Sequence, residues 1–407
     1  MNIWLINHYA GSPSHGMEYR PYYMALEWKR IGHEVTIIAA SQAHLRSKQP
    51  YVTGNMTEEV IDGIRYVWLK TPCYSGNGVG RVSNMLAFVT GLFWFYSQIK
   101  KKYRPDVVIA SSTYPLDVLP ARYFARKNNA KLIFEVHDLW PLSPVELGGV
   151  SKWHPFIMTM QWAENYAYRN AGKVVSMLPK ACTHMMEHGM NKEKFVYVPN
   201  GINMSEWNLN EDILPESHAR EFEKLRLQGM FVLIYAGAHG IANALDTLIG
   251  AMERLKDEKI VAVFVGQGPE KEKLQQRAYD RKLSNVVFLP AVAKSLIPSI
   301  LNQANVLYIG WKHQPLYRFG ISPNKLFDYM MSGKAVIHSV KAGNDLVADS
   351  GCGLSVPPEN PRAIAEAILT MQSMSHAERA EMGARGREYV MRHHDYRVLA
   401  QKFIESL

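Results

Sequence analysis

Residues 322–330 read SPNKLFDYM, a pattern typical of the start of a helix. Ser322 is a favoured N-cap residue, and Pro323 suits the first helical position because the N–H that proline lacks would be unpaired there. Gly333 is placed to end the helix, and the apolar residues 335–339 predict the buried strand that follows. This stretch therefore predicts one helix–strand unit of an α/β fold.

The first turn of this helix is a candidate anion site. Asn324, Lys325 and Leu326 lie where free backbone N–H groups and the helix dipole attract negative charge, and Lys325 adds a full positive charge. Asp328 follows Lys325 by three residues, so we expect it on roughly the same face one turn later. A phosphate at the helix start and a carboxylate one turn further suit a nucleoside diphosphate and its ribose. An ordinary capped helix packed on a sheet is the alternative interpretation.

The same order of elements occurs in both halves of the chain. Residues 3–7 predict a strand, residues 18–31 a helix and residues 34–40 a second strand, and the order starts again at the strand 231–236. Alternating strands and helices predict parallel sheets with right-handed connections. Because 407 residues exceed the usual size of one hydrophobic core, we expect two doubly wound α/β domains that join near residue 200.

Loops at the carboxyl ends of parallel strands are where such sheets bind ligands. Gly16 allows a close approach of the backbone there, although the GxGxxG fingerprint of dinucleotide-binding proteins is absent. The turn GAHG at 237–240 precedes a predicted helix and is a second candidate phosphate site. His137 and Asp138 directly follow the predicted strand 131–136. His137 could carry a proton, contact a sugar or be a structural histidine.

The formal net charge of +9, with a pI near 9.2, indicates an anionic partner. Basic residues are scattered apart from residues 100–104, and no aromatic–basic RNA motif or zinc finger accompanies them, so nucleic acid is the least favoured partner. The three widely separated cysteines predict no disulfide framework and no zinc cluster. They and the strand-like N-terminus, which lacks the pattern of a signal peptide, predict a cytoplasmic protein.

Residues 83–102 predict a long helix rich in aromatic residues. Its apolar part is too short to span a bilayer, which takes about 20 residues, but it would suit a helix lying on an anionic membrane surface. The candidates for contact with such a surface are Phe93, Trp94, Lys100, Lys101 and Lys102. The alternative is a core helix whose basic end complements its dipole, and the two interpretations can hold on different faces.

Motifs in matching order run along the whole chain. The first half contains the Gly16 loop, GHEVT at 32–36, RPD at 104–106, His137-Asp138 and PNGI at 199–202. The second half contains YAG at 235–237, GQGP at 266–269, Lys325 with Asp328, and GKAVI at 333–337. With these motifs the chain resembles the GT-B glycosyltransferases, specifically the large retaining family four that uses nucleotide-sugar donors. MEYRP at 17–21 and SPNK at 322–325 resemble the O-antigen or capsule transferases of the N-acetylfucosamine type.

The chain departs from this family at its paired-glutamate motif. The two glutamates would fall at Gly320 and Asp328, so the first carboxylate is absent and the second is shortened. The arginine and lysine that usually follow the glycine turn fall at Ala238 and Asn243, so the leaving diphosphate must be neutralised by other groups. The replacements that the sequence offers are Arg318, Lys325 and His239.

The resemblance implies a GT-B architecture in which two Rossmann-like domains face a central cleft. Residues 1–203 would form the acceptor side, residues 204–387 would bind the donor, and the helix 388–407 would cross back onto the first domain. The implied reaction moves a sugar from an NDP-sugar, UDP-linked, with retention and without a cofactor or metal, and no DxD motif is present. The implied sugar is an N-acetylated amino sugar such as N-acetylfucosamine. The implied acceptor is a lipid-linked saccharide of O-antigen, lipopolysaccharide or capsule synthesis, at the inner face of the plasma membrane.

The residue roles follow from the same comparison with family motifs. The expected catalytic residues are His137, Lys325 and Arg318. The expected donor-binding residues are Gly16, Gly237, His239, Gly240, Gly268, Ser322, Pro323, Asn324, Lys325, Leu326 and Asp328. The candidates for acceptor contact or gating are Glu18, Arg20 and Asp138. Two other functions remain open, a nonhydrolysing UDP-sugar epimerase of the same fold and a catalytically inactive protein that only binds nucleotide sugar.

Overall fold

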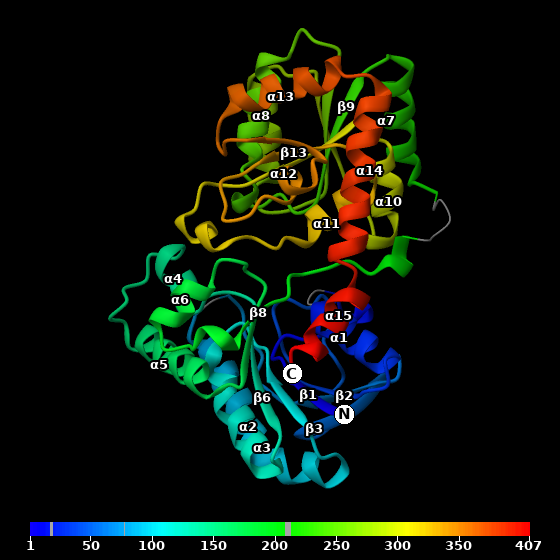
Figure 1. Ribbon diagram of the computed structural model, residues 1–407. Helices are drawn as coiled ribbons and strands as arrows, with labels where there is room; N and C mark the ends of the chain where they lie inside the picture. The colour runs from blue at the N-terminus through cyan, green and yellow to red at the C-terminus, as the bar shows by residue number, and fades with distance from the viewer. Residues whose placement is uncertain (17–18, 77, 208–212) are drawn as a thin grey trace. The chain divides into compact units, whose positions relative to one another are not determined.

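The computed structural model describes residues 1–16, 19–76, 78–207 and 213–407. The chain divides into two compact units (Figure 1). Unit 1 comprises Met1–Asn200 together with Tyr396–Leu407, and unit 2 comprises Gly201–Asp395. The final segment that packs in unit 1 is therefore shorter than the predicted 388–407. Each unit contains one sheet. All the strands of both sheets are parallel except one edge strand in unit 1.

The sheet of unit 1 has eight strands in the order β3-β4-β2-β1-β5-β6-β7-β8. Only β3 is antiparallel, and it pairs with β4 at the edge of the sheet. The strands are β1 (Asn2–Ile6), β2 (Glu34–Ala40), β3 (Met56–Ile61), β4 (Ile64–Leu69), β5 (Val107–Ala110), β6 (Lys131–Val136), β7 (Lys173–Ser176) and β8 (Phe195–Tyr197). The central strands are buried along nearly their whole length, as expected for a parallel sheet with helices on both faces.

The helices of unit 1 cover both faces of this sheet. On one face α1 packs against the last helix through Trp28 on Phe403 and through the stacked rings of Tyr23 and Tyr396. The helices are α1 (Tyr19–Arg30), α2 (Val79–Lys102), α3 (Val118–Asn128), α4 (Leu142–Glu146), α5 (Pro155–Asn170), α6 (Cys182–Glu187) and α15 (Tyr396–Glu405). No helix among the described residues, α2 included, is long and apolar enough to cross a membrane.

Unit 2 has a six-stranded, fully parallel sheet in the order β11-β10-β9-β12-β13-β14. The strands are β9 (Phe231–Ala236), β10 (Ile260–Val265), β11 (Val286–Leu289), β12 (Val306–Gly310), β13 (Val336–Ser339) and β14 (Gly353–Val356). The strand order reverses between β9 and β12. In doubly wound sheets this switch point, at the carboxyl ends of the strands, is where ligands bind.

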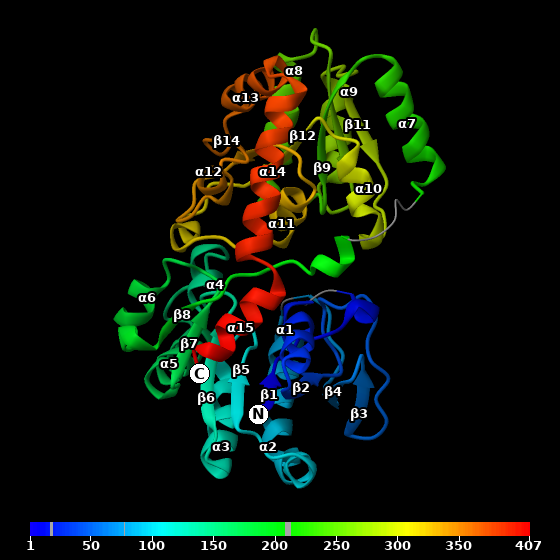
Figure 2. The same ribbon diagram turned by 45° about the vertical axis from the view of Figure 1, so that its right-hand side comes forward.

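Helices cover both faces of this second sheet (Figure 2), and a hydrophobic core lies on each face. One core is formed with α8 (Leu245–Arg254), α9 (Lys271–Asp280) and α13 (Pro361–Ser373). The other is formed with α7 (Glu216–Leu227), α10 (Ile297–Asn302), α11 (Asn324–Met331), α12 (Leu346–Ser350) and α14 (His376–His393). The two cores hold the loops at the strand ends on a rigid support.

Three predicted elements differ from the structure. The helix expected from Ser322 begins at Asn324, and Pro323 is its cap, because the backbone at Pro323 is extended (ψ 123°). The segment between the predicted strand 34–40 and β4 contains the edge strand β3, which its polar sequence does not predict. The long helix expected from residue 83 begins at Val79.

Candidate functional site

Two loops of unit 2 pack tightly against each other at the ends of β9 and β10. The N–H of Gly237 donates to the carbonyl of Val265 (2.9 Å), and that of His239 donates to the carbonyl of Gln267 (2.9 Å). A Cβ at Gly268, where φ is +155°, would lie 2.6 Å from the carbonyl oxygen of His239. This close backbone approach requires glycine, so Gly268 is needed for the packing of the two loops against each other.

Lys325 points from the first turn of α11 toward this pair of loops. Its Nζ donates to Tyr235 Oη (2.6 Å) and to Asn243 Oδ1 (3.0 Å). Tyr235 Oη and Asn243 Nδ2 both donate to the carbonyl of Ala238 (2.6 and 3.0 Å). A Cβ at Gly237 would lie 2.6 Å from Lys325 Cε, so the missing side chain makes room for the lysine.

This network includes Asn243, one of the positions at which the chain departs from the family motif. The expected lysine after the glycine turn is Asn243 here, yet an ammonium group reaches Asn243 from α11. The partners Tyr235 and Asn243 were not predicted to contact Lys325, because they come from β9 and from the short helix η5 (Ile241–Asn243) about 80 residues earlier in the chain. The only sequence signal was the departure at Asn243 itself.

Burial lowers the pKa of Lys325 to about 7. Its two hydrogen-bond partners are neutral, and no carboxylate among the described residues pairs with it to compensate for the lost hydration. A bound phosphate would supply the missing negative charge and favour the protonated form. The site is therefore suited to an anionic ligand.

His239 is fully buried in the glycine turn. Neither ring nitrogen has a hydrogen-bond partner among the described residues. Burial, together with the charges of Lys271 and Lys325, lowers the pKa of His239 to about 4, so the ring is neutral near pH 7. The neutral ring contributes no positive charge to a diphosphate, so the positive charge near this turn comes from Lys325 and Lys271.

The loop before α11 is clamped to the loop after β13. Asn344 accepts from the N–H of Ile321 (2.8 Å) and donates to its carbonyl (3.0 Å). Arg318 is exposed, lies 4.2 Å from the ring centre of Phe319 and donates to the carbonyl of Pro315 (2.8 Å). The clamp fixes the start of α11, and therefore the position of Lys325, whereas Arg318 lies on the surface of the loop.

Asp328 has different neighbours from Lys325. It is half-buried, and burial raises its pKa to about 7, with a smaller rise from Glu206 and an opposing effect from Lys294. Lys294 Nζ itself donates to Glu206 Oε2 (2.6 Å). The expected contact of Asp328 with ribose stays a prediction.

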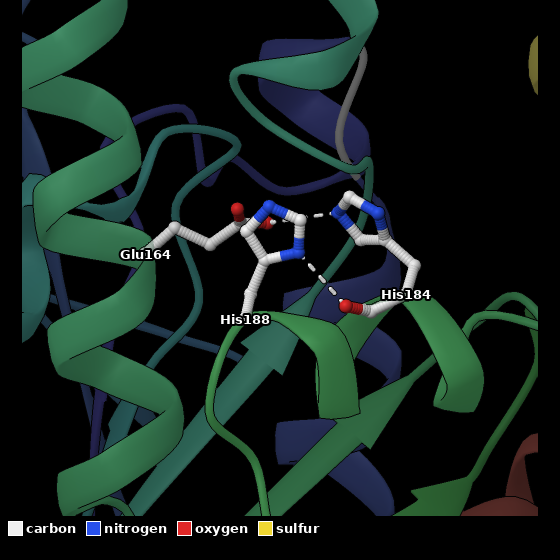
Figure 3. A group of neighbouring side chains, drawn as sticks. All are labelled: Glu164, His184 and His188. Carbon is white, nitrogen blue, oxygen red and sulfur yellow. Dashed lines mark hydrogen bonds and ion pairs between the residues drawn. The ribbon is translucent and has the colours of Figure 1, made fainter.

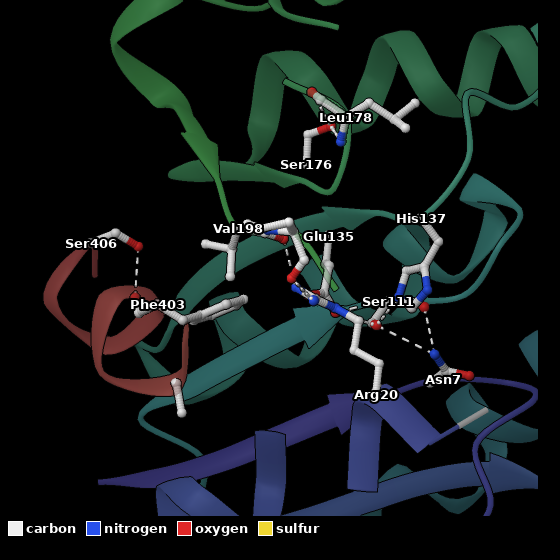
Figure 4. Close-up of polar contacts among 12 residues, drawn as sticks. Asn7, Arg20, Ser111, Glu135, His137, Ser176, Leu178, Val198, Phe403 and Ser406 are labelled. Atoms are coloured by element: carbon white, nitrogen blue, oxygen red, sulfur yellow. Dashed lines mark hydrogen bonds and ion pairs between the residues drawn. The ribbon is translucent and has the colours of Figure 1, made fainter. Parts of the chain in front are cut away.

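In unit 1, His137 belongs to a buried polar network at the end of β6 (Figure 4). His137 Nε2 lies 2.9 Å from Ser111 Oγ and 3.4 Å from Glu135 Oε2. Ser111 Oγ donates to Glu135 Oε2 (2.6 Å), so the proton between His137 and Ser111 belongs to Nε2. Asn7 Nδ2 donates to the carbonyl of Ser111 (2.7 Å).

The carboxylate of Glu135 is the centre of this network. Burial by itself would raise the pKa of Glu135, but the Arg20 guanidinium and the hydrogen bonds from His137 and Ser111 hold it well below its usual range. Arg20 Nη2 lies 2.8 Å from Glu135 Oε1 and also donates to the carbonyl of Val198 (3.0 Å). Arg20, predicted to contact an acceptor, is thus buried in a structural ion pair. Glu135 was missed, although a lone acidic residue in an apolar strand was a signal.

The remaining predicted residues are scattered over unit 1. Gly16 (φ +85°) packs on Ser47, whose Oγ would lie 2.4 Å from an added Cβ, so a contact within the unit explains this glycine. Asp138 is exposed, and Glu18 lies outside the described residues. On α2, Trp94 is 81% exposed and Phe93 42% exposed.

The opposite face of α2 is buried, with Met85, Phe88, Leu92 and Ile99 in the core. One face of the helix therefore packs in the core while aromatic side chains on another face are exposed. This agrees with the expectation that the two interpretations of the helix can hold on different faces. At its end Lys100 lies 5.6 Å from the ring centre of Tyr96, Lys101 is exposed, and Lys102 pairs with Glu58 (3.0 Å).

Comparison with known proteins shows that both units are similar to glycosyltransferase domains. Residues 15–201 match the family model of the glycosyl transferase 4-like domain, and residues 230–373 match that of the group 1 glycosyl transferases. The candidate colanic acid biosynthesis glycosyl transferase WcaI of Escherichia coli strain K12 is 22% identical over 360 residues, which are 84% of this chain and 85% of that protein. These matches do not favour an epimerase or a protein that only binds nucleotide sugar.

Solved structures share the fold over nearly the whole chain. Sucrose-phosphate synthase of Thermosynechococcus elongatus has a TM-score of 0.71 at 17% identity, covering 99% of this chain and 97% of that chain. HepE of Anabaena, solved with UDP and glucose, has a TM-score of 0.67 at 16% identity, covering 99% and 98%. With its two parallel-sheet α/β units, the chain belongs to the group 1 glycosyltransferases of the GT-B fold.

Proposed function

We propose that this glycosyltransferase takes its sugar from a nucleoside-diphosphate sugar, UDP-linked, that unit 2 binds. The observation that carries the proposal is the ammonium group of Lys325, held beside the Gly237 turn by Tyr235 and Asn243. HepE, a relative in fold, was solved with UDP and with UDP-glucose. A diphosphate at the turn would meet the lysine and the first turn of α11 together.

The chemistry of the step follows from where charge develops. As the bond between the sugar and the diphosphate breaks, negative charge grows on the leaving phosphate. Lys325 and the backbone N–H groups at the start of α11 are fixed before the reaction, so they stabilise this charge without rearranging. We propose that these groups supply the charge stabilisation without a metal and that the sugar is transferred with retention.

The identity of sugar and acceptor is a finer part of the proposal. We propose an N-acetylated amino sugar, such as N-acetylfucosamine, and a lipid-linked saccharide acceptor in O-antigen, lipopolysaccharide or capsule synthesis. Support comes from the SPNK motif at 322–325 and from the name of WcaI, which refers to colanic acid, a polysaccharide. Exposed Trp94 and Lys101 on α2 support a peripheral position on the inner face of the plasma membrane.

A thermal-shift series across nucleotides tests the donor site. Wild-type protein, Lys325→Ala and the exposed control Lys341→Ala are each heated with UDP, UDP-N-acetylglucosamine, GDP, CMP and NAD. We expect UDP compounds to raise the Tm of the wild type and the control because they bind the native state, and Lys325→Ala to lose this rise. Equal shifts in Lys325→Ala and wild type would remove Lys325 from the site, and no shift with any nucleoside diphosphate would overturn the proposed donor.

A further inference from the structure

Three possible metal ligands meet in unit 1 (Figure 3). Glu164 comes from α5, and His184 and His188 come from α6 and the residue that caps it. One donor atom from each side chain lies within 4.8 Å of the other two. Glu164 and His184 are buried and His188 is half-buried. The two histidines are four residues apart, which places them on one face of the helix.

Hydrogen bonds orient the side chains of His188 and Glu164. His188 Nδ1 lies 2.9 Å from the carbonyl oxygen of His184, and a carbonyl can only accept, so Nδ1 carries the proton. Nε2 of the neutral ring then carries the lone pair that a metal needs. Tyr168 Oη donates to Glu164 Oε1 (2.8 Å), and Gln161 Nε2 donates to Oε2 (2.7 Å). Such outer contacts are typical of metal sites, where they fix the orientation of the ligands.

The charge balance of the group also favours a cation. No lysine or arginine in the described part of the chain pairs with the buried carboxylate of Glu164, so a bound metal ion would be its cationic partner. His184 Nε2 lies 4.0 Å from Glu164 Oε1. Ligand atoms on one tetrahedral zinc ion are roughly 3.3 Å apart, so binding needs side-chain shifts of less than about 1 Å.

We propose that Glu164, His184 and His188 bind one divalent metal ion of the zinc class. Two imidazoles and a carboxylate are the ligand types that zinc and its neighbours in the first transition row prefer, whereas magnesium and calcium prefer oxygen ligands alone. Three protein ligands leave a fourth position for water. The ion would join α5 to α6, which is only six residues long, and so fasten the segment that follows β7.

Titration calorimetry on the full chain, free of affinity tags and stripped of metal, tests this site with Zn²⁺ and Mg²⁺. We expect the wild type to bind one equivalent of Zn²⁺ and no Mg²⁺. His188→Gln and Glu164→Gln should weaken Zn²⁺ binding by about tenfold or more, because each removes a ligand. The control His376→Gln changes an exposed histidine of unit 2 and should bind Zn²⁺ as the wild type does.

Co²⁺ provides an independent readout of the same site. A tetrahedral site with imidazole ligands should give the wild type visible d–d absorption, which Zn²⁺ removes by displacement and which Glu164→Gln does not show. Glu164→Gln keeps the shape of the side chain and an oxygen that can still accept a hydrogen bond from Tyr168 or Gln161, so the variant should fold. Absence of Zn²⁺ binding by the wild type, or unchanged binding by both His188→Gln and Glu164→Gln, would overturn the proposal.

Discussion

The ammonium group of Lys325 is buried beside two neutral oxygens, and this placement sets how its charge responds to pH. Because burial lowers its pKa to about 7, the free protein loses the proton as the pH rises through that value, well below the ordinary range of lysine. A bound diphosphate favours the charged form, so binding above pH 7 must take up a proton.

The first prediction follows from this linkage. The affinity for UDP-sugar should fall between pH 7 and pH 9, with a limiting slope of about one decade per pH unit, because the proton that binding needs becomes scarcer. Calorimetry in buffers of different ionisation enthalpy measures both the affinity and the proton uptake. In Lys325→Met the slope and the uptake should vanish, and a pH-independent affinity in the wild type would contradict the assigned role.

His137 provides the second prediction at this scale. Its Nε2 is held by Ser111 and Glu135, which keeps the ring in one orientation. If the ring acts at the reacting sugar, His137→Ala should lower kcat by about tenfold or more while the donor KM changes little. His376→Ala, an exposed histidine in unit 2, is the control. Unchanged turnover in His137→Ala would make this histidine structural.

At the scale of elements, the paired loops after β9 and β10 hold the donor site in shape. Gly268→Ala should destabilise unit 2 by about 1–3 kcal/mol, because its φ is +155° and the added Cβ would lie 2.6 Å from the His239 carbonyl oxygen. Urea unfolding measures the loss. Gly229→Ala is the matched control, since its φ is also positive (+64°) but nothing lies within 4 Å of an added Cβ. An equal effect at both glycines would argue against close loop packing.

The buried strands could be predicted from the sequence because each is a short, continuous apolar run. The predicted bounds 131–136 and 231–236 are those of β6 and β9. The edge strand β3 (MTEEVI) was missed because its polar, half-exposed residues carry no apolar run, and its pairing with β4 is what orders it.

The candidate site was predictable only in part. The Lys325 motif and the His137-Asp138 pair carry local signals, since they lie at a helix start and a strand end. The contacts of Tyr235 and Asn243 with Lys325 became visible only in the tertiary structure, because they join segments that are 90 and 82 residues apart, whereas Glu135 carried the signal of a lone acidic residue in an apolar strand. Ser322 was mistaken for the cap because propensity favours serine there, whereas the backbone turns into the helix one residue later.

At the scale of the whole molecule, the net charge of +9 and the exposed side chains of α2 bear on where the enzyme works. We expect the protein to sediment with anionic vesicles and to be released by salt or by reversing the charges of Lys100, Lys101 and Lys102. Vesicles of neutral lipid are the control. Persistent binding of the charge-reversed variant, or no binding by the wild type, would refute the membrane contact.

Our main proposal is that Lys325 of unit 2 binds the diphosphate group of a nucleotide sugar, so that the sugar can be transferred. The most direct test measures UDP release from UDP-N-acetylamino sugars with lipid-linked acceptor present, for wild type, Lys325→Ala and Lys341→Ala. We expect acceptor-dependent UDP release by the wild type and Lys341→Ala, with kcat/KM lowered by more than about tenfold in folded Lys325→Ala. Undiminished release by Lys325→Ala would contradict the proposal.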